Sequence, residues 1–182
     1  MARMTRLVTI DDLLTDPQYK RGELWDGHFV VRDPAGGRSP VIGPSVSVAL
    51  ASRPEVRRFG RVLDASAGFI VALDPDRVLS PDVALVSRER HPTVPTKGFF
   101  EGAPELAVEV RSPRDTWVSV VEKGGVWIGH GVRLVWCVDP QAETILVLRP
   151  GVEPELVGMG GALDLAPLVD ARVPHAAVFA DL

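Results

Sequence analysis

The sequence predicts a mixed α/β fold in which helices cover the faces of a central sheet. Short runs rich in valine, leucine and isoleucine alternate with turn residues along most of the chain and are typical of strands. Residues 115–131 carry apolar side chains at helical spacing and lie between two such runs. A helix between two strands of one sheet requires a crossover, so at least one strand pair should be parallel.

The N-terminal third should contain two helices and a hairpin. A short helix over residues 9–14 precedes a hairpin over residues 22–34, whose turn is Asp26-Gly27. The second helix should begin near Pro44, because proline is tolerated in the first helical turn, and should end before Pro54.

The remainder of the chain is mainly strand. The expected strands cover residues 60–65, 68–73, 82–87, 105–110, 132–140 and 143–150. The helix over residues 115–131 falls between the fourth and fifth of these, and residues 151–182 alternate short strands with turns. The length of 182 residues indicates a single domain over residues 1–182.

Composition limits the classes of protein that remain. The chain is 46% hydrophobic and 24% charged, which is ordinary for a globular protein with a core. A net charge of −4 argues against a general nucleic-acid coat protein, but not against an enzyme that acts on nucleic acid.

The cysteine and histidine content argues against a disulfide and against a zinc site. Cys137 is the only cysteine and lies in an apolar run, so we expect it to be buried, with no disulfide, in a cytoplasmic protein. None of the four histidines has a partner at zinc-ligand spacing. No apolar run is long enough for a signal peptide or a membrane span.

Two expected strands carry an acid among valines. Asp82 opens the run "DVALVS", and Glu109 lies within "ELAVEV". With a strand period of two, Glu109 and Arg111 share one face, and Val110 points to the other. Pro81 fits the first residue of a strand, because proline cannot donate to the ladder. If the two runs pair, the two carboxylates converge.

Adjacent carboxylates repel each other unless a proton or a cation lies between them. Mg²⁺ binds to a few carboxylates together with water and phosphate oxygens, and it can activate water for attack on a phosphate. Two alternatives remain open at this point. Asp82 could simply cap a turn after Pro81, or Asp82 and Glu109 could be the acid and base of a glycosidase.

The acids also match a known pattern. Pro81-Asp82, followed by Glu109-Val110-Arg111, resembles the PD-(D/E)XK motif of nucleases. The surrounding segments resemble, in order, those of the Uma-type family of restriction endonucleases over roughly residues 21–151. These segments are "GELWDGHFVV", "LSPDVALVS", "EGAPELAVEVRSP" and "EKGGVWIGHGVRLVWCVDPQAETILVLRPG".

The resemblance implies a restriction-endonuclease-like fold, with a mixed central sheet flanked by helices, an N-terminal hairpin and extra C-terminal strands. It implies an endonuclease that uses Mg²⁺ or Mn²⁺ to hydrolyse phosphodiester bonds of DNA, and a possible homodimer.

The resemblance also implies roles for individual residues. Asp82 and Glu109 would be the metal ligands, assisted by Glu23 of the first hairpin. Lys123, from the following helix, would position or deprotonate the attacking water. Arg111 occupies the usual lysine position and would steady the phosphate, since a guanidinium stays protonated. A salt bridge to a nearby acid is the alternative for Arg111.

The chain departs from the family in two places. Family members often carry a histidine after the first hairpin, where this chain has "GGRSPVIG" and Arg38 could take its place. Gly124-Gly125 follow Lys123 and cost its helix about 1 kcal/mol each. These departures motivate the alternative of a catalytically inactive nuclease-fold protein that acts as a nucleic-acid or protein-binding module.

One stretch concentrates positive charge. It contains Arg53, Arg57, Arg58 and Arg61. A solvated loop is the default interpretation, and contact with a phosphate backbone is the other.

Overall fold

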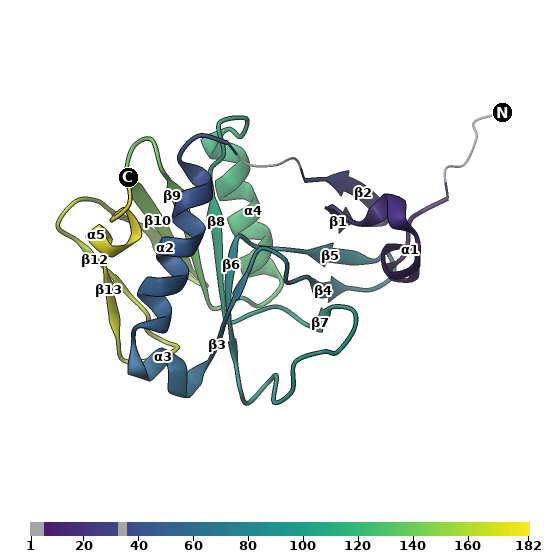
Figure 1. Ribbon diagram of the computed structural model, residues 1–182, viewed down its shortest axis with the longest axis horizontal. Helices are drawn as coiled ribbons and strands as arrows, with labels where there is room; N and C mark the ends of the chain where they lie inside the picture. Colours follow the sequence, from purple (N-terminus) through teal and green to yellow (C-terminus); the bar gives the residue numbers. More distant parts are fainter. Residues whose placement is uncertain (1–5, 33–35) are drawn as a thin grey trace.

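A six-stranded mixed sheet forms the centre of the computed structural model, which describes residues 6–32 and 36–182 (Figure 1). The strand order is β11-β10-β9-β8-β6-β3. The strands are β3 (Gly60–Asp64), β6 (Val83–Ser87), β8 (Leu106–Val110), β9 (Leu134–Asp139), β10 (Thr144–Arg149) and β11 (Val152–Val157). Strands β8 and β9 are parallel and the other neighbours are antiparallel, so the predicted mixed sheet is confirmed.

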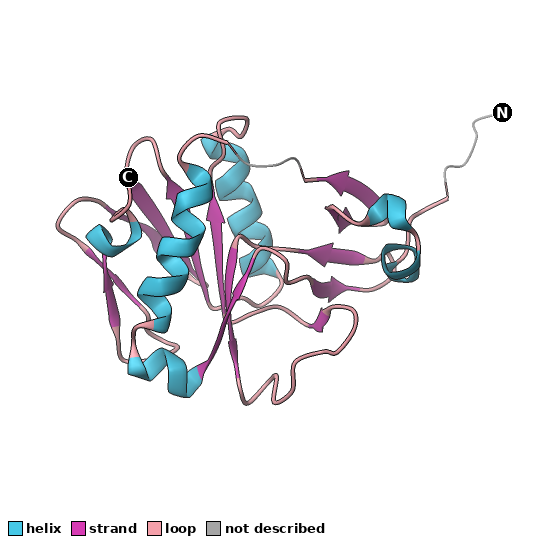
Figure 2. Cartoon of the chain, in the orientation of Figure 1, coloured by secondary structure: helices cyan, strands magenta, loops and turns pink. Residues whose placement is uncertain are grey.

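A second, five-stranded sheet lies beside the first (Figure 2). Its order is β2-β1-β5-β4-β7. The strands are β1 (Gly22–Trp25), β2 (His28–Val31), β4 (Phe69–Ala72), β5 (Arg77–Leu79) and β7 (Phe100–Glu101). The expected N-terminal hairpin is therefore an edge of this sheet, and its turn residues Asp26 and Gly27 have φ angles of 50° and 76°.

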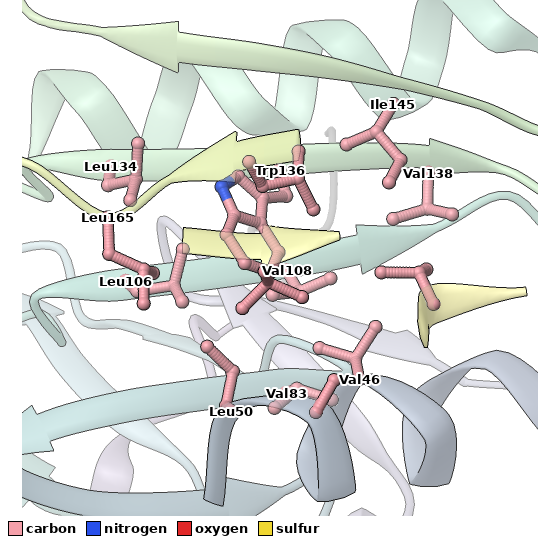
Figure 3. Packing of buried hydrophobic residues seen from close by; sticks show 14 of the residues in the cluster. Val46, Leu50, Val83, Leu106, Val108, Leu134, Trp136, Val138, Ile145 and Leu165 are labelled. Atoms are coloured by element: carbon pink, nitrogen blue, oxygen red, sulfur yellow. The ribbon is translucent and has the colours of Figure 1, made fainter. Parts of the chain in front are cut away.

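The two long helices cover opposite faces of the six-stranded sheet (Figure 1). Helix α2 (Ser39–Ala51) packs on the face that carries Leu106 and Val108, and helix α4 (Trp117–Gly129) packs on the face that carries Ala107. Helix α4 is also the crossover between β8 and β9, as the sequence predicts. Figure 3 shows the α2 side of the core, where side chains of α2 meet those of the central strands.

Smaller elements complete the fold. They are α1 (Ile10–Thr15), the 3₁₀ helix η1 (Pro17–Tyr19), α3 (Pro54–Phe59), α5 (His175–Val178) and the antiparallel pair β12 (Ala162–Asp164) and β13 (Arg172–Pro174). The C-terminal elements bury apolar side chains against the α2 face, which is where the expected extra strands lie. Within the described residues, no helix is both long and apolar enough to cross a membrane.

The predicted start of the second helix was wrong. Helix α2 begins at Ser39, and Pro44 lies inside it. Pro40 already occupies the first turn, and the missing N–H of Pro44 removes only one helical hydrogen bond. The fully buried side chains of Ile42 and Val46 anchor this part of the helix to the sheet.

The basic stretch is not a loop. Residues Pro54–Phe59 form helix α3, with Pro54 in its first turn and with Arg57 and Arg58 in its last. Both positions suit a helix, because proline fits the start and cations complement the negative end of the helix dipole.

Candidate functional site

Asp82 and Glu109 lie opposite each other on neighbouring strands. Val83 of β6 pairs with Val108 of the antiparallel β8, so the preceding Asp82 comes to stand across from Glu109. The backbone N–H of Asp82 donates to the carbonyl of Val108 at 2.9 Å, and the N–H of Val110 donates to Asp82 Oδ2 at 2.7 Å. The Asp82 carboxylate therefore extends the ladder, and the acids meet where the sequence pattern places them.

Glu109 is buried on the face covered by α4. Its side chain accepts a hydrogen bond at 2.6 Å from the indole N–H of the buried Trp127, and Lys123 Nζ lies 3.0 Å from the same oxygen, Oε1. Since a buried carboxylate without partners would be costly, these two donors explain how a core strand accommodates it. The other carboxylate oxygen, Oε2, receives no hydrogen bond from the described residues.

Lys123 also reaches the second sheet. Its Nζ donates to Glu23 Oε1 at 2.8 Å and to the carbonyl of Ser80 at 3.3 Å. Glu23, on β1, further accepts from the backbone N–H of Ser80 at 2.8 Å and from the indole of Trp25 at 3.1 Å. Glu23 is only 4% exposed, so it is not an ordinary surface residue of the hairpin.

Arg32 is a member of the cluster that sequence reasoning missed. It follows β2 and donates to Asp82 Oδ1 at 2.8 Å and to the carbonyl of Ser80 at 2.7 Å, and it lies 3.9 Å from Glu23. The register of the hairpin indicates that Arg32 belongs to this cluster. Val30 pairs with Glu23, so Arg32, two residues beyond Val30, shares the face of Glu23.

The cluster combines three carboxylates with two cations. Burial, together with repulsion from Asp82 and Glu23, outweighs the attraction of Lys123 and raises the pKa of Glu109 to about 7. Burial alone would lower the pKa of Lys123, but the attraction of Glu109 and Glu23 prevails and raises it. Burial would likewise raise the pKa of Glu23, but Lys123 and Arg32 hold it below its usual value.

Arg111 does not join this cluster. Its guanidinium forms a 2.8 Å salt bridge with Asp139 at the end of β9, and its Nε donates to the carbonyl of Asp115 at 3.3 Å. Arg38 also binds elsewhere, donating to Glu143 at 3.3 Å. Of the five residues expected at the site, four come together and Arg111 stands apart.

Gly124 allows helix α4 to approach the sheet closely. A Cβ at this position would lie 2.8 Å from Cys137 Sγ and 2.8 Å from Leu148 Cδ1. Gly125 faces open space. Gly124 therefore has a packing role, which brings the neighbouring Lys123 over β8. Gly125 has no such role in the described structure. Cys137 itself is buried, as expected, and burial raises the pKa of its thiol to about 12.

A cavity of about 750 Å³ opens over these residues. Its lining includes the three carboxylates, Lys123 and Arg32, together with apolar side chains of β1, β2 and α4. The donor set suits Mg²⁺, which takes oxygen ligands and is often held by one or two carboxylates plus water and phosphate. No group of three or more histidine, cysteine or acidic side chains within residues 6–32 and 36–182 is arranged to hold a metal. A metal here would therefore rely on Asp82 and Glu109.

A mixed sheet with acids on adjacent strands and a lysine from the crossover helix defines a nuclease-like α/β protein. The chain belongs to the Uma2 family, described as "Putative restriction endonuclease", whose model matches residues 8–173. The fold is similar to the crystal structure of "a putative nuclease belonging to DUF820" from Anabaena variabilis ATCC 29413. The TM-score is 0.79 at 20% identity, covering 95% of this chain and 98% of the other. No curated protein matches the chain.

The family and the restriction-endonuclease-like fold inferred from the sequence are thus confirmed. Lys123 contacts Glu109 and Arg32 contacts Asp82, so each acid of the glycosidase alternative is paired with a cation of the protein.

Proposed function

We propose that this protein is a metal-dependent endonuclease that hydrolyses phosphodiester bonds of DNA, with Mg²⁺ or Mn²⁺ as its metal. The observation that carries the proposal is the position of Lys123 Nζ, 3.0 Å from Glu109, which itself stands across the β6–β8 ladder from Asp82. A lysine beside two acids at the wall of a cavity is the combination that phosphodiester hydrolysis requires.

Each residue of the cluster has a distinct role in this proposal. Asp82 and Glu109 hold the metal, which when bound would polarise the phosphate and lower the pKa of a bound water. Glu23 and Glu109 hold Lys123 as an ammonium, because their attraction raises its pKa. An ammonium cannot accept a proton, so Lys123 positions the water and stabilises the negative charge that develops on the phosphate.

Hydrolysis then proceeds by attack of water on phosphorus. A bond forms between the water oxygen and phosphorus, and the bridging P–O bond breaks. The water loses one proton to the solvent, and the leaving oxygen takes up one proton in exchange. The salt bridge of Arg111 with Asp139 favours a structural role for that arginine. Arg32, which already binds Asp82, is the better placed guanidinium for contacting a phosphate in the cavity.

One observation favours the second candidate, an inactive nuclease-fold protein that binds nucleic acid or protein. Both oxygens of Asp82 accept hydrogen bonds from the protein itself, one from Arg32 and one from Val110. A metal that binds Asp82 must compete with Arg32. If Arg32 does not yield, the carboxylates serve as a structural network and no hydrolysis follows.

Plasmid nicking in the presence of Mg²⁺ or Mn²⁺ tests the first candidate. Glu109→Gln should abolish nicking, whereas Glu153→Gln, the same change at an exposed position of β11, should leave it intact. Asp82→Asn, which keeps an acceptor for the Val110 N–H, should also be inactive. Thermal unfolding establishes that each variant is folded.

The outcomes separate the two candidates. Nicking that survives in folded Asp82→Asn or Glu109→Gln protein would exclude this site as the catalytic centre. A folded wild-type protein that neither nicks DNA nor binds Mn²⁺ in calorimetry would favour the inactive module.

A further inference from the structure

One side of the cavity is apolar, although the acids lie close by. We name as the Trp25 wall the residues Trp25, Val30, Val31 and Val126, all of which line the cavity. Val30 and Val31, on the edge strand β2, are 48% and 64% exposed. The proposed hydrolysis uses none of the three valines, and Trp25 contributes to the acid cluster only through its indole N–H.

The ring of Trp25 is held in a fixed orientation. Its N–H donates to Glu23, and the guanidinium of Arg77 lies over the ring, 5.5 Å from its centroid. Arg77 is in turn held by two hydrogen bonds to Asp26, at 2.6 and 3.1 Å, and by contact with His130 at 2.7 Å. Arg77 does not line the cavity, so it supports the ring from outside. A planar group that binds to Trp25 would therefore find a pre-organised aromatic surface.

The charge of the cavity argues against a substrate that is held mainly by its phosphates. Among the described residues, its lining contains five carboxylates and three cations, a formal excess of two negative charges. The carboxylates are Glu23, Asp82, Glu109, Asp115 and Glu122, and the cations are Arg32, Arg114 and Lys123. A metal would only neutralise this excess. Since binding of a DNA backbone depends on cations that neutralise phosphates, this cavity offers little of that attraction.

The concentrated arginines of the chain do not supply the missing charge. Arg57 and Arg58 lie on α3, which leads into β3 at the point where Gly60 pairs with Ser87. Ser87 ends β6, whereas Asp82 precedes the start of that strand. The arginines of α3 therefore lie at the opposite end of β6 from the acids. Substrate binding in the cavity must draw on another interaction.

We propose that the Trp25 wall is a nucleobase subsite and that the substrate is single-stranded DNA. This inference rests on the proposed function and specifies its substrate. A cavity of about 750 Å³ has the size of small-molecule sites and has room for a nucleotide. A base can reach the ring of Trp25 only after it leaves the helical stack, and stacking on an aromatic side chain binds any base without reading its sequence.

Equilibrium binding of fluorescent DNA tests the inference, with Ca²⁺ in place of Mg²⁺ to slow cleavage. The probes are a single-stranded 12-mer and a hairpin duplex of the same sequence. Wild-type protein should bind the single strand at least about tenfold more tightly. Because three cations of residues 6–32 and 36–182 line the cavity, the salt dependence should correspond to about three phosphate contacts or fewer.

Two substitutions separate stacking from the hydrogen bond to Glu23. Trp25→Phe keeps an aromatic face and loses the indole N–H, and Trp25→Ala loses both. We expect about a tenfold loss of single-strand affinity for Trp25→Ala and a smaller loss for Trp25→Phe. Val48→Ala, at an exposed valine of α2 outside the cavity lining, should bind like wild type.

A single strand that lacks all its bases should bind wild type no better than Trp25→Ala binds normal DNA. This probe needs no variant, so it remains informative if Trp25→Ala does not fold. Equal or tighter binding of the duplex, or equal losses in Trp25→Phe and Trp25→Ala, would overturn the nucleobase subsite while leaving the nuclease proposal standing. If folded wild type binds neither DNA, the proposed function fails and this inference fails with it.

Discussion

Replacing Gly124 by alanine would place a methyl group between helix α4 and the six-stranded sheet. The new Cβ would lie 2.8 Å from Cys137 Sγ and from Leu148 Cδ1, and 3.4 Å from Val135 Cγ1. Leu148 can move its terminal methyl group, but Cys137 is short and buried in β9. Crowding of this kind costs about 1–3 kcal/mol. Alanine also favours a helix over glycine by about 1 kcal/mol, so we expect a net loss of about 0–2 kcal/mol.

The neighbouring glycine provides a matched control. Gly125 is exposed, and a Cβ added there would meet no atom within 4 Å, so Gly125→Ala should stabilise the protein by about 0.5–1 kcal/mol. The helix-propensity gain is the same in both variants and cancels in their difference. What remains, about 1–3 kcal/mol, measures the close approach of α4 to the sheet.

Urea unfolding of the two variants, with the slope m compared between them, gives this difference directly. The variant Gly124→Ala/Cys137→Ala should unfold at higher urea than the sum of its single substitutions implies, because removal of Sγ makes room for the methyl group. If Gly124→Ala were as stabilising as Gly125→Ala, the close approach would be refuted. The explanation of how Lys123 is brought over β8 would be lost with it.

Three further predictions concern the charged residues. Because the pKa of Glu109 is raised from 4.5 to about 7, its stabilising contribution is full below pH 4.5 and is lost as the pH rises through about 7. The melting temperature of Glu109→Gln in EDTA should therefore rise relative to wild type over that range, and a constant difference would contradict this. Arg32→Met should bind Mn²⁺ about tenfold more tightly in calorimetry, because the metal no longer displaces a charged hydrogen bond to Asp82; unchanged affinity would show that Arg32 does not compete. Arg111→Gln should lose about 1 kcal/mol of stability in urea, through its salt bridge to Asp139, with no change in Mn²⁺ affinity.

The sequence pattern predicts those parts of the site that follow from strand geometry. A period of two places Glu109 on the face opposite Val108 and Val110, and antiparallel pairing of two valine-rich runs brings Asp82 across from it. The crossover helix follows from its position between two strands that must share a sheet. These features depend on local periodicity, which can be recognised in a single sequence.

Contacts between the two sheets could not be predicted in the same way. Whether Glu23 and Arg32 of the hairpin meet the acids of the central sheet depends on how the sheets pack, and period alone does not give their separation. Trp127 is fully buried on α4, and its hydrogen bond to Glu109 depends on the rotation of α4 over β8. Strand β5 was missed because three residues are too few to show a period.

The glycine pair no longer supports the idea of a decayed site, since the space at Gly124 is filled by the sheet. The missing family histidine is not replaced by Arg38 either, because that arginine binds Glu143 outside the acid cluster. What distinguishes an enzyme from an inactive module is instead Arg32. It occupies one oxygen of Asp82, and the cluster keeps one more carboxylate than it has cations. A cluster with an unbalanced acid favours an added cation, whereas a purely structural network would gain from balance. The Mn²⁺ affinity of Arg32→Met therefore bears on both candidates, because it measures how strongly the protein's own guanidinium opposes the metal.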